Sequence, residues 1–407
     1  MNFVQFISSR IWYNSSSSFS TLINKIAIGG IALGVTIILL SFLILIGFKN
    51  EIEKNVYSFS GHYNLSKYSG GLSYKDNPIN LYEGLNPVLN KLTYVKHSHP
   101  YILSPVLLKS HSEDIEGVLF KGINQNFNFN SFKDKLIEGS WIEFNKNENY
   151  SNQIVISSKL KRTLDAKVGD NVFLYFANNP PIYRKLELKG VFETGMEEFD
   201  NNFIFGDLLL LQKIYNWNDS LVSGVEIFID NSDKVDIYYS DLEANSFFDE
   251  YLEKTDAKYI QVFEWLKLLD RNILIFFSLI LFVASFNMIS ILLILIMERI
   301  RMIGVLKALG LKNNQIKNIF LFNGFKLILL GIFFGNIISI SLGFLQKKYK
   351  MFQLDKSSYY MEYVPISWDF TSFFQLNLTI FLITFMSMFL PVIIINKIKI
   401  LDSIKFS

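Results

Sequence analysis

The hydrophobic residues of the chain gather in four long runs that hold no charged side chain. These runs are Ile26–Phe48, Asn272–Met297, Leu327–Gln346 and Phe370–Asn396. A helix needs about 20 predominantly apolar residues to cross the hydrocarbon core of a bilayer. Each run reaches that length, and we therefore predict four transmembrane helices over 26–48, 272–297, 327–346 and 370–396.

The first run is not the apolar core of a cleaved signal peptide. It is longer than the roughly 7–15 residues typical of such a core, and no small-residue cleavage site follows it. The run leaves the membrane through Gly47-Phe48-Lys49-Asn50-Glu51. Residues Lys49–Ser60 keep helical spacing, which predicts that the first helix continues outward as far as Gly61.

Between the first and second runs, residues 49–271 alternate short strands with short helices. Strands are predicted over Tyr63–Tyr68, Tyr101–Ser110, Ile115–Ile123, Ile154–Ile156, Asn171–Phe176, Arg184–Thr194, Asn202–Gly206 and Gly224–Asp230. Helices are predicted over Pro87–Val95, Ser157–Leu164 with Ser157 as its N-cap, Asp207–Tyr215 and Val262–Asp270. The pattern predicts an α+β domain, which we expect to divide into two lobes near residues 125–150.

Basic residues set the orientation of the four predicted helices. Short segments around Arg10 and Lys25, over Arg299–Lys326 and over Lys397–Lys405 carry an excess of lysine and arginine. The positive-inside rule places all three in the cytoplasm. Both termini are then cytoplasmic: residues 1–25 form an amphipathic stub, 298–326 a cytoplasmic connection and 397–407 a tail. Residues 49–271 and the loop 347–369 lie outside the cytoplasm, and in a bacterial inner membrane this is the periplasm.

Composition agrees with membrane helices joined to a water-exposed domain. The 407 residues are 50% hydrophobic and 19% charged, with a net charge of only +2. Residues 49–271 hold 24 basic and 32 acidic side chains, whereas the remainder holds 15 basic and 5 acidic. A total so near neutrality argues against a nucleic-acid partner. The chain has no cysteine, so its outer domain folds without disulfides and a thiol nucleophile is excluded.

No motif for catalysis or cofactor binding occurs in the sequence. There is no G-x-x-x-x-G-K-[ST] phosphate loop, no H-E-x-x-H and no G-x-S-x-G. His97 and His99 are two apart and would share one face of a strand, where they could hold a metal. The alternative is that both are solvated or packed histidines near Pro100, and this is our expectation. We expect no enzyme activity, cofactor or metal on this chain.

The stretch Met297–Gly310 follows the second predicted membrane helix into the cytoplasm. Ile300, Ile303, Leu306 and Lys307 recur at helical spacing, and Gly310 fits the left-handed position that ends a helix. A short helix with an apolar face must bury that face. One alternative is the membrane surface, with Arg299 and Arg301 as anchors. The other is a groove on a cytoplasmic motor protein.

Several segments together resemble the FtsX/MacB-type ABC permeases, and particularly the lipoprotein-releasing (LolC/LolE-type) permeases. The segments that carry the resemblance are Gly30-Ile31-Ala32-Leu33-Gly34-Val35, Gly47–Glu51, Glu138-Gly139-Ser140-Trp141, Ile154–Asp170, Gly190-Val191-Phe192, Ala284-Ser285-Phe286-Asn287-Met288-Ile289 and the stretch 297–310. The segments occur in the order and at the spacing typical of these permeases, and the resemblance covers nearly the whole chain.

The resemblance implies four membrane helices with a MacB-like periplasmic domain between the first two. It implies two permease subunits, either two copies of this chain or one with a sister subunit, and a separate cytoplasmic ATPase that holds ATP and magnesium. The cargo would be a lipoprotein, passed to a periplasmic chaperone. The implied ATPase-coupling residues are Glu298, Arg299, Arg301, Ile303, Gly304, Leu306, Lys307, Leu309 and Gly310.

The resemblance also suggests candidates for the cargo path and for the chaperone contact. Path candidates are Val35, Ile38, Phe42, Phe282 and Phe286; alternatively, these residues face lipid or pack between helices. The loop Phe176–Arg184 stands where chaperone-binding members carry a longer hairpin, and its candidates are Asn178, Asn179, Pro180 and Pro181. The short loop and a tail without P-x-x-A-L-R depart from the family pattern.

Other functions remain open at the level of sequence. The chain could be an FtsX-like regulator of cell-wall hydrolases or an efflux permease. An outer domain of about 220 residues argues against the first, and the lack of a fused ATPase argues against the second. A membrane-anchored sensor is a different class, but it needs a sizeable cytoplasmic output domain. No predicted cytoplasmic segment exceeds about 30 residues.

Overall fold

The computed structural model describes residues 18–68, 77–89, 91–109, 115–144, 150–178, 180–355, 359 and 361–397. The tail 398–407, Asn179, His111 and most of the predicted amphipathic stub lie outside the described residues. The chain divides into two compact units. The first comprises residues 1–50, 265–353 and 363–407, and the second comprises 51–264 and 354–362.

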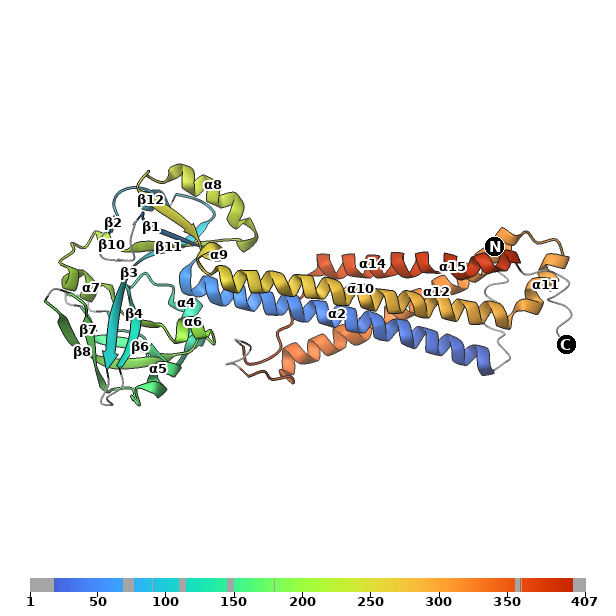
Figure 1. Cartoon of the computed structure of the whole chain (residues 1–407), viewed down its shortest axis with the longest axis horizontal. Coiled ribbons are helices and arrows are strands. Elements are labelled where there is room, and N and C mark those ends of the chain that lie inside the picture. Colours follow the sequence, from blue (N-terminus) through green and yellow to red (C-terminus); the bar gives the residue numbers. More distant parts are fainter. Residues whose placement is uncertain are drawn as a thin grey trace. The chain divides into compact units, whose positions relative to one another are not determined.

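Four long helices dominate the first unit, and they confirm the predicted membrane spans. They are α2 (Ser18–Ser60), α10 (Ile260–Glu298), α12 (Asn313–Tyr349) and α14 (Phe370–Ser387), the last continued by α15 (Phe389–Val392) and the 3-10 helix η3 (Ile393–Lys397) (Figure 1). All four are long and apolar enough to cross a membrane. The chain is therefore a multi-pass membrane protein. As predicted, α2 continues to Ser60, and Gly61 follows it with a φ of 67°.

Small residues allow α2 to approach α12 closely inside this unit. A Cβ atom added at Gly331 would lie 2.5 Å from Ile31, and one at Gly335 would lie 2.6 Å from Val35. The hydroxyl of Thr36 on α2 donates to the carbonyl oxygen of Gly335 at 3.2 Å. These glycines therefore serve packing within one chain, as in other membrane helix pairs with small residues at their contact.

The second unit is built around a closed circuit of six strands. In order around the circuit they are β3 (Val95–Lys109), β4 (Ile115–Ile123), β9 (Phe203–Asp207), β6 (Gln153–Ser157), β8 (Ile182–Phe192) and β7 (Asn171–Phe176). The circuit closes because β7 pairs with both β8 and β3. We call it the barrel.

Further strands extend this sheet from two members of the barrel. The first half of β3 pairs with β11 (Gly224–Ile229), which is followed by β1 (Tyr63–Lys67) and β12 (Glu250–Lys254). On the other side, β5 (Leu136–Gly139) pairs with β8. A separate two-stranded sheet joins β2 (Ile79–Asn80) to β10 (Leu221–Val222).

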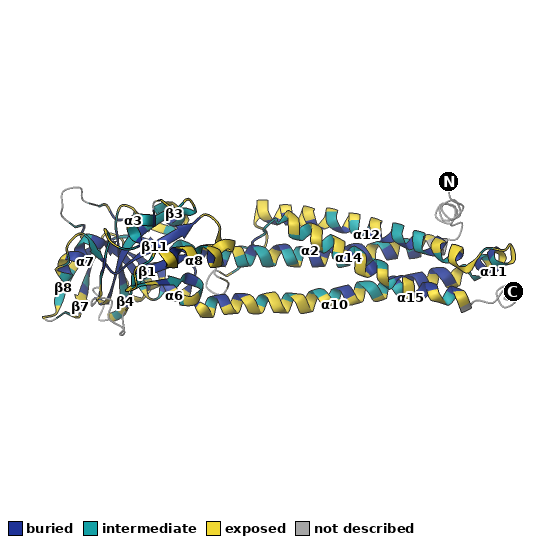
Figure 2. Ribbon diagram, turned by 90° about the horizontal axis from the view of Figure 1, so that it is seen from above, coloured by how far each residue is buried: buried dark blue, intermediate teal, exposed yellow. Residues whose placement is uncertain are grey.

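Alternating apolar residues fill the inside of the barrel. Val106 and Leu108 of β3, Val118 and Phe120 of β4, and Leu174 of β7 are buried in one hydrophobic core (Figure 2). Successive residues of a strand point to opposite faces. The residues between them, such as Leu107, Leu119 and Tyr175, therefore face outward.

Short helices complete this unit. They are α3 (Asn86–Leu89), α4 (Phe129–Phe132), η1 (Lys133–Lys135), α5 (Ser158–Thr163), α6 (Glu197–Asp200), α7 (Leu208–Tyr215), η2 (Ser232–Lys234), α8 (Val235–Asn245) and α9 (Thr255–Lys258). The predicted N-cap of α5 is confirmed, because the Ser157 hydroxyl oxygen accepts from the amide of Leu160 at 3.1 Å.

Two predictions for this unit are wrong. The helix predicted over 87–95 ends at Leu89, and β3 begins at Val95 rather than Tyr101. Pairing with β11 stabilises the extended form there, and this tertiary interaction overrides the local preference. Among the described residues no lobe boundary lies near 125–150, because β3 and β4 pair with β7 and β9, which follow that region in the chain. The sequence reading also missed β5, β12 and α8.

Candidate functional site

The predicted cytoplasmic helix is present as α11 (Ile300–Ala308). It ends as predicted at Gly310, whose φ is 90°. The amide of Gly310 donates to Lys307 O and the amide of Leu311 donates to Leu306 O, at 3.0 and 3.1 Å. This pair of bonds is a Schellman motif, in which a glycine satisfies carbonyl groups that the helix end leaves free.

The helix α11 has one packed face and one exposed face. Ile303 and Leu306 are buried in a cluster with residues of α10, α12, α15 and η3. Gly304 is also buried, and Lys307 donates to the carbonyl oxygen of Ile395 at 2.8 Å. These predicted coupling residues therefore hold α11 to its own chain.

The remaining predicted coupling residues leave a surface on which another protein could dock. Val305 is 52% exposed and Leu309 is 73% exposed. Glu298, Arg301 and Gly310 are exposed beside them, and Arg299 is half-buried. We call the side chains of Arg301, Val305 and Leu309 the exposed face of α11. Val305 was not among the predicted site residues, although its spacing from Arg301 and Leu309 places all three on one side of a helix.

The five predicted path residues do not gather in one place. Val35 and Ile38 are buried in the helix bundle core, while Phe42 is half-buried. Phe282 and Phe286 lie on α10 with more than 60% of their surface exposed, and their rings stack at 6.4 Å. The structure thus brings Val35 and Ile38 together in the bundle core, and Phe282 and Phe286 together in an exposed apolar stripe on α10 that also includes Leu279 and Val283.

The loop between β7 and β8 is short, as its sequence indicates. Asn178 is half-buried, and its amide side chain donates to the carbonyl oxygen of Ile214 at 3.4 Å. Pro180 and Pro181 are exposed. Asn179 lies outside the described residues. The accessible side chains in the described part of the loop are therefore Ala177 and the two prolines.

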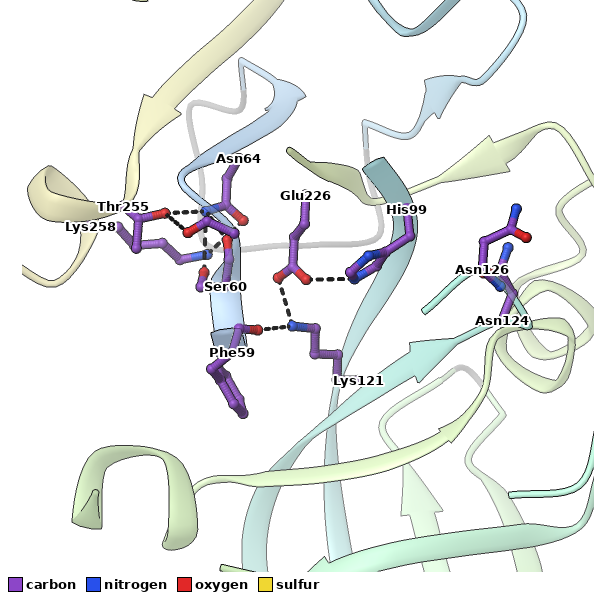
Figure 3. Close-up of polar contacts among 11 residues, drawn as sticks. Phe59, Ser60, Asn64, His99, Lys121, Asn124, Asn126, Glu226, Thr255 and Lys258 are labelled. Atoms are coloured by element: carbon purple, nitrogen blue, oxygen red, sulfur yellow. Dashed lines mark hydrogen bonds and ion pairs between the residues drawn. The ribbon is translucent and has the colours of Figure 1, made fainter. Parts of the chain in front are cut away.

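A buried ionic cluster joins the end of α2 to the sheet of the second unit (Figure 3). Lys121 of β4 donates to the carbonyl oxygen of Phe59, in the last turn of α2, and to Glu226 Oε1, both at 2.6 Å. His99 of β3 lies 2.9 Å from Glu226 Oε2. All three side chains are almost completely buried. We call Lys121, Glu226 and His99 the ionic cluster.

Charge is distributed unequally in the ionic cluster. Burial acts to raise the pKa of Glu226, but the Lys121 ammonium and the hydrogen bond to His99 outweigh it and hold that pKa at about 2. Burial lowers the pKa of His99. At neutral pH the glutamate is therefore ionised and the histidine is neutral. Glu226 Oε2 then accepts from His99 Nε2–H, and His99 Nδ1 has no hydrogen-bond partner among the described residues.

Aromatic rings surround the same end of α2. Phe59 stacks on Phe199 at 4.0 Å and meets the edges of Phe203 and Phe205 at 4.8 and 5.8 Å. The Lys121 ammonium lies 4.6 Å from the centre of the Phe59 ring. A cation over a buried ring is attracted by its quadrupole. The last turn of α2 is thus held by both apolar and ionic contacts.

Within the described part of the chain, His97 and His99 do not form a metal site with other residues. The rings of His97 and His99 are 5.3 Å apart, yet His99 is engaged with Glu226. No group of three His, Asp or Glu side chains that could hold a metal occurs among the described residues.

Sequence reasoning missed the ionic cluster. Its signal was a charged residue flanked on both sides by apolar neighbours within a strand, in Leu119-Phe120-Lys121-Gly122-Ile123 and in Val225-Glu226-Ile227. Charged residues are almost never fully buried unless they are paired. Two such strands of opposite charge therefore predict a buried pair.

Two family models match the chain. The MacB-like periplasmic core domain matches residues 26–239, and the FtsX-like permease C-terminal domain matches residues 274–400. The first match covers more than half of the chain.

Curated relatives align over most of the length of the chain. An uncharacterized membrane protein of Buchnera aphidicola (subsp. Schizaphis graminum) is 24% identical, with 98% of each chain covered. The lipoprotein-releasing system transmembrane protein LolC of Neisseria meningitidis is 23% identical, covering 87% of this chain and 86% of its own. The lipoprotein-releasing system transmembrane protein LolE of Haemophilus influenzae is 23% identical, covering 79% of this chain and 78% of its own.

Among solved structures, the periplasmic region of MacB from Actinobacillus actinomycetemcomitans is 14% identical with a TM-score of 0.34. The alignment covers 52% of this chain and 96% of that one. The extracellular domain of the transporter YknZ is 13% identical with a TM-score of 0.33. That alignment covers 47% of this chain and 98% of the YknZ domain.

Replacing Lys121 with methionine should destabilise the second unit by about 3–5 kcal/mol, because it leaves the buried Glu226 carboxylate without its ammonium partner. Adding Glu226→Gln should recover part of that loss, since the buried charge is then gone. Denaturant unfolding of the purified chain in detergent, followed by tryptophan fluorescence, measures both. A double variant as unstable as the sum of the two single variants would contradict the pairing.

Acidification should lower the stability of the second unit through His62. The ring of this histidine stacks on Tyr57 of α2, with their centres 4.3 Å apart. Burial, with a smaller effect from Lys96, lowers the pKa of His62 to about 4. Because the folded state resists protonation, stability should be complete above about pH 6.5 and fall by about 2–3 kcal/mol towards pH 4. Unfolding measured between pH 7.5 and 4 should show a shallower loss in His62→Gln. An unchanged pH dependence in that variant would exclude His62 as the cause.

Proposed function

The chain belongs to the family defined by the MacB-like periplasmic core domain, and we propose that this permease subunit serves an ABC transporter that releases lipoproteins from the inner membrane. The second unit then lies in the periplasm, and both termini lie in the cytoplasm. The partners are a cytoplasmic ATPase that binds ATP and magnesium, a second permease subunit and a periplasmic chaperone.

The observation that carries the proposal is the extent of the likeness to the lipoprotein-releasing relatives. LolC of Neisseria meningitidis aligns with 87% of this chain and 86% of its own length. A shared ectodomain alone would also fit an efflux permease. The match of the FtsX-like permease C-terminal model to residues 274–400, which include α11 and the last two membrane helices, supports the whole permease arrangement.

Energetics explain why such a permease needs an ATPase. Each methylene group moved from a bilayer into water costs about 0.8 kcal/mol. Lifting a lipoprotein out of the membrane therefore requires both a source of free energy and a sheltered apolar path. The exposed apolar stripe of α10, with Phe282 and Phe286, is a candidate wall of that path when a second permease subunit faces it.

The exposed face of α11 is where the ATPase should dock. Val305 and Leu309 are apolar and accessible, and Arg301 lies beside them. The opposite face is fixed to α12, α15 and η3 through Ile303, Leu306 and Lys307. A push on the exposed face is therefore passed to the membrane helices rather than absorbed by movement of α11.

Changing Val305 and Leu309 together to aspartate should abolish association with the ATPase, because two charges would enter an apolar contact. We expect at least about a tenfold loss of ATPase in a pull-down from detergent-solubilised membranes. Asn314→Asp, which is exposed on the neighbouring turn, is the matched control and should retain binding. Undiminished association of the double variant would exclude this surface. Leu306 is unsuitable for this test, since it is part of the packed face.

Depletion of the protein should leave lipoproteins in the inner membrane. Fractionation of inner and outer membranes, followed by quantification of acylated proteins, measures their distribution. Re-expression of the wild-type chain, but not of the Val305→Asp/Leu309→Asp variant, should restore the outer-membrane fraction. Normal lipoprotein distribution together with altered cell-wall hydrolysis would instead support a regulator of the FtsX kind.

A further inference from the structure

A pocket of about 530 Å³ lies between the last turns of α12 and the first turn of α14. Its walls include Ser341, Phe344, Trp368, Asp369, Phe370 and Phe373. All of these residues belong to the first unit. We call this cavity the Trp368 pocket. It shares no residue with the exposed face of α11, with the stripe on α10 or with the ionic cluster.

The pocket lies where two membrane helices leave the apolar core of the bilayer. The charge-free run of α12 ends at Gln346 and is followed by Lys347, whereas Asp369 directly precedes the run that begins at Phe370. We call the side of the pocket next to Lys347 and Asp369 its polar end. The rest of the wall is apolar and open, with Phe344 58% exposed. In a membrane such a surface faces acyl chains, and its polar end lies at the level of the lipid head groups.

The walls of the Trp368 pocket are fixed by contacts within the chain. The indole ring of Trp368 packs against α12 at Gly343, where an added Cβ atom would lie 3.1 Å from the ring. The amide of Ser367, the residue before it, donates to the carbonyl oxygen of Leu43 on α2 at 3.3 Å. The pocket is therefore formed before a ligand enters it, as is usual for small-molecule sites.

Lysine side chains supply the positive charge at the polar end. Lys347 and Lys348 follow Phe344 by three and four residues, a spacing that places both on the pocket side of α12. Both are exposed, and none of the ion pairs between described residues includes either one. Lys350, beyond the end of the helix, lies instead over the ring of Tyr363, 4.1 Å from its centre. Two ammonium groups are thus available to a lipid phosphate.

The carboxylate of Asp369 supplies the negative charge on the opposite wall. Its Oδ1 accepts from the amide of Thr371 at 3.1 Å, and its Oδ2 accepts from the amide of Ser372 at 3.3 Å and from the hydroxyl of the same serine. These hydrogen bonds, that of the hydroxyl above all, hold the pKa of Asp369 below its usual value, so the group is ionised at neutral pH. A carboxylate has about four acceptor positions. Oδ1 therefore keeps one for a ligand.

We propose that the Trp368 pocket binds one molecule of phosphatidylethanolamine. An acyl chain lies along the apolar wall, the phosphate pairs with Lys347 or Lys348, and the primary ammonium donates to Asp369. Basic pockets between membrane helices commonly hold lipid phosphates. Here a carboxylate stands across from the lysines, which matches a head group that carries both signs of charge.

The other common head groups match the polar end less well. Phosphatidylglycerol has no cation for Asp369 and brings its phosphate towards that carboxylate. Phosphatidylcholine carries a quaternary ammonium, which donates no hydrogen bond. Such a cation is usually held in a cage of aromatic rings. Phe370 is 82% exposed and does not enclose one.

Photolabelling of the full chain in nanodiscs tests the proposal. The bulk lipid is phosphatidylcholine, and the probes are phospholipids with a diazirine in one acyl chain and an ethanolamine, choline or glycerol head group. Labelled peptides are located by mass spectrometry. We expect the ethanolamine probe to label residues 340–344 and 370–373 about tenfold more than the other two probes, which is the gain from one charge-assisted hydrogen bond.

Asp369→Asn separates the head-group contact from folding. Asparagine caps a helix about as well as aspartate does, so α14 should still begin at the same residue while the charge is lost. Labelling by the ethanolamine probe should then fall to the level of the choline probe.

Further variants test the phosphate contact and the apolar wall. Lys347→Met/Lys348→Met should weaken pocket labelling by all three probes, because each carries a phosphate. Ser341→Trp should remove it, since Ser341 is exposed on the pocket wall and a large side chain there fills the cavity. Lys326→Met is the control, because Lys326 lies nearer the other end of α12 and does not line the pocket.

Several results would overturn the assignment. They are equal labelling by the three probes, a preference for the glycerol probe, an ethanolamine preference that persists in Asp369→Asn, and label spread evenly along α10, α12 and α14. Absence of pocket labelling by every probe would likewise overturn it and show that protein, such as a second copy of this chain, covers the site. Because no ATPase or lipoprotein takes part, these outcomes are distinguishable from failure of the proposed function.

Discussion

The end of α2 is the point on which the architecture of the second unit depends. A helix leaves its last carbonyl groups without intrahelical partners, and burying them unsatisfied is costly. Here the carbonyl of Phe59 enters the domain interior and accepts from the Lys121 ammonium. Burying that ammonium in turn requires Glu226, and Glu226 requires His99 as a second donor. The strands β3, β4 and β11 are thereby tied to one helix terminus by a chain of mutually dependent groups.

The membrane helices depend on a different constraint: α2 and α12 must pack closely together through uncharged residues. Gly331 and Gly335 lie against Ile31 and Val35, and the packed face of α11 continues this contact network at the end of the bundle. A helix seated in this way moves as part of the bundle. In the proposed transporter, the exposed face of α11 recognises the ATPase and the packed face transmits its force to the bundle.

The membrane helices could be predicted from sequence because the bilayer requires an apolar run of a certain length without charged residues. Both properties can be read directly from the order of residues. The same holds for Gly310 and Ser157, whose roles are set by local backbone geometry. The first half of β3 could not be predicted, since only its pairing with β11 makes it extended. The ionic cluster depends on residues 99, 121 and 226 meeting in space. The division of α11 into two faces likewise depends on α12, α15 and η3, which its own periodicity does not reveal.

Closure of the barrel has a consequence for the association of this domain with other chains. A sheet edge presents unpaired backbone groups that can recruit strands from other chains. The six central strands have neighbours on both sides, and at the periphery β5 is only four residues long while the Leu252 carbonyl of β12 accepts from the Tyr239 hydroxyl. A domain that folds without disulfides is thus protected against edge-to-edge association with other chains.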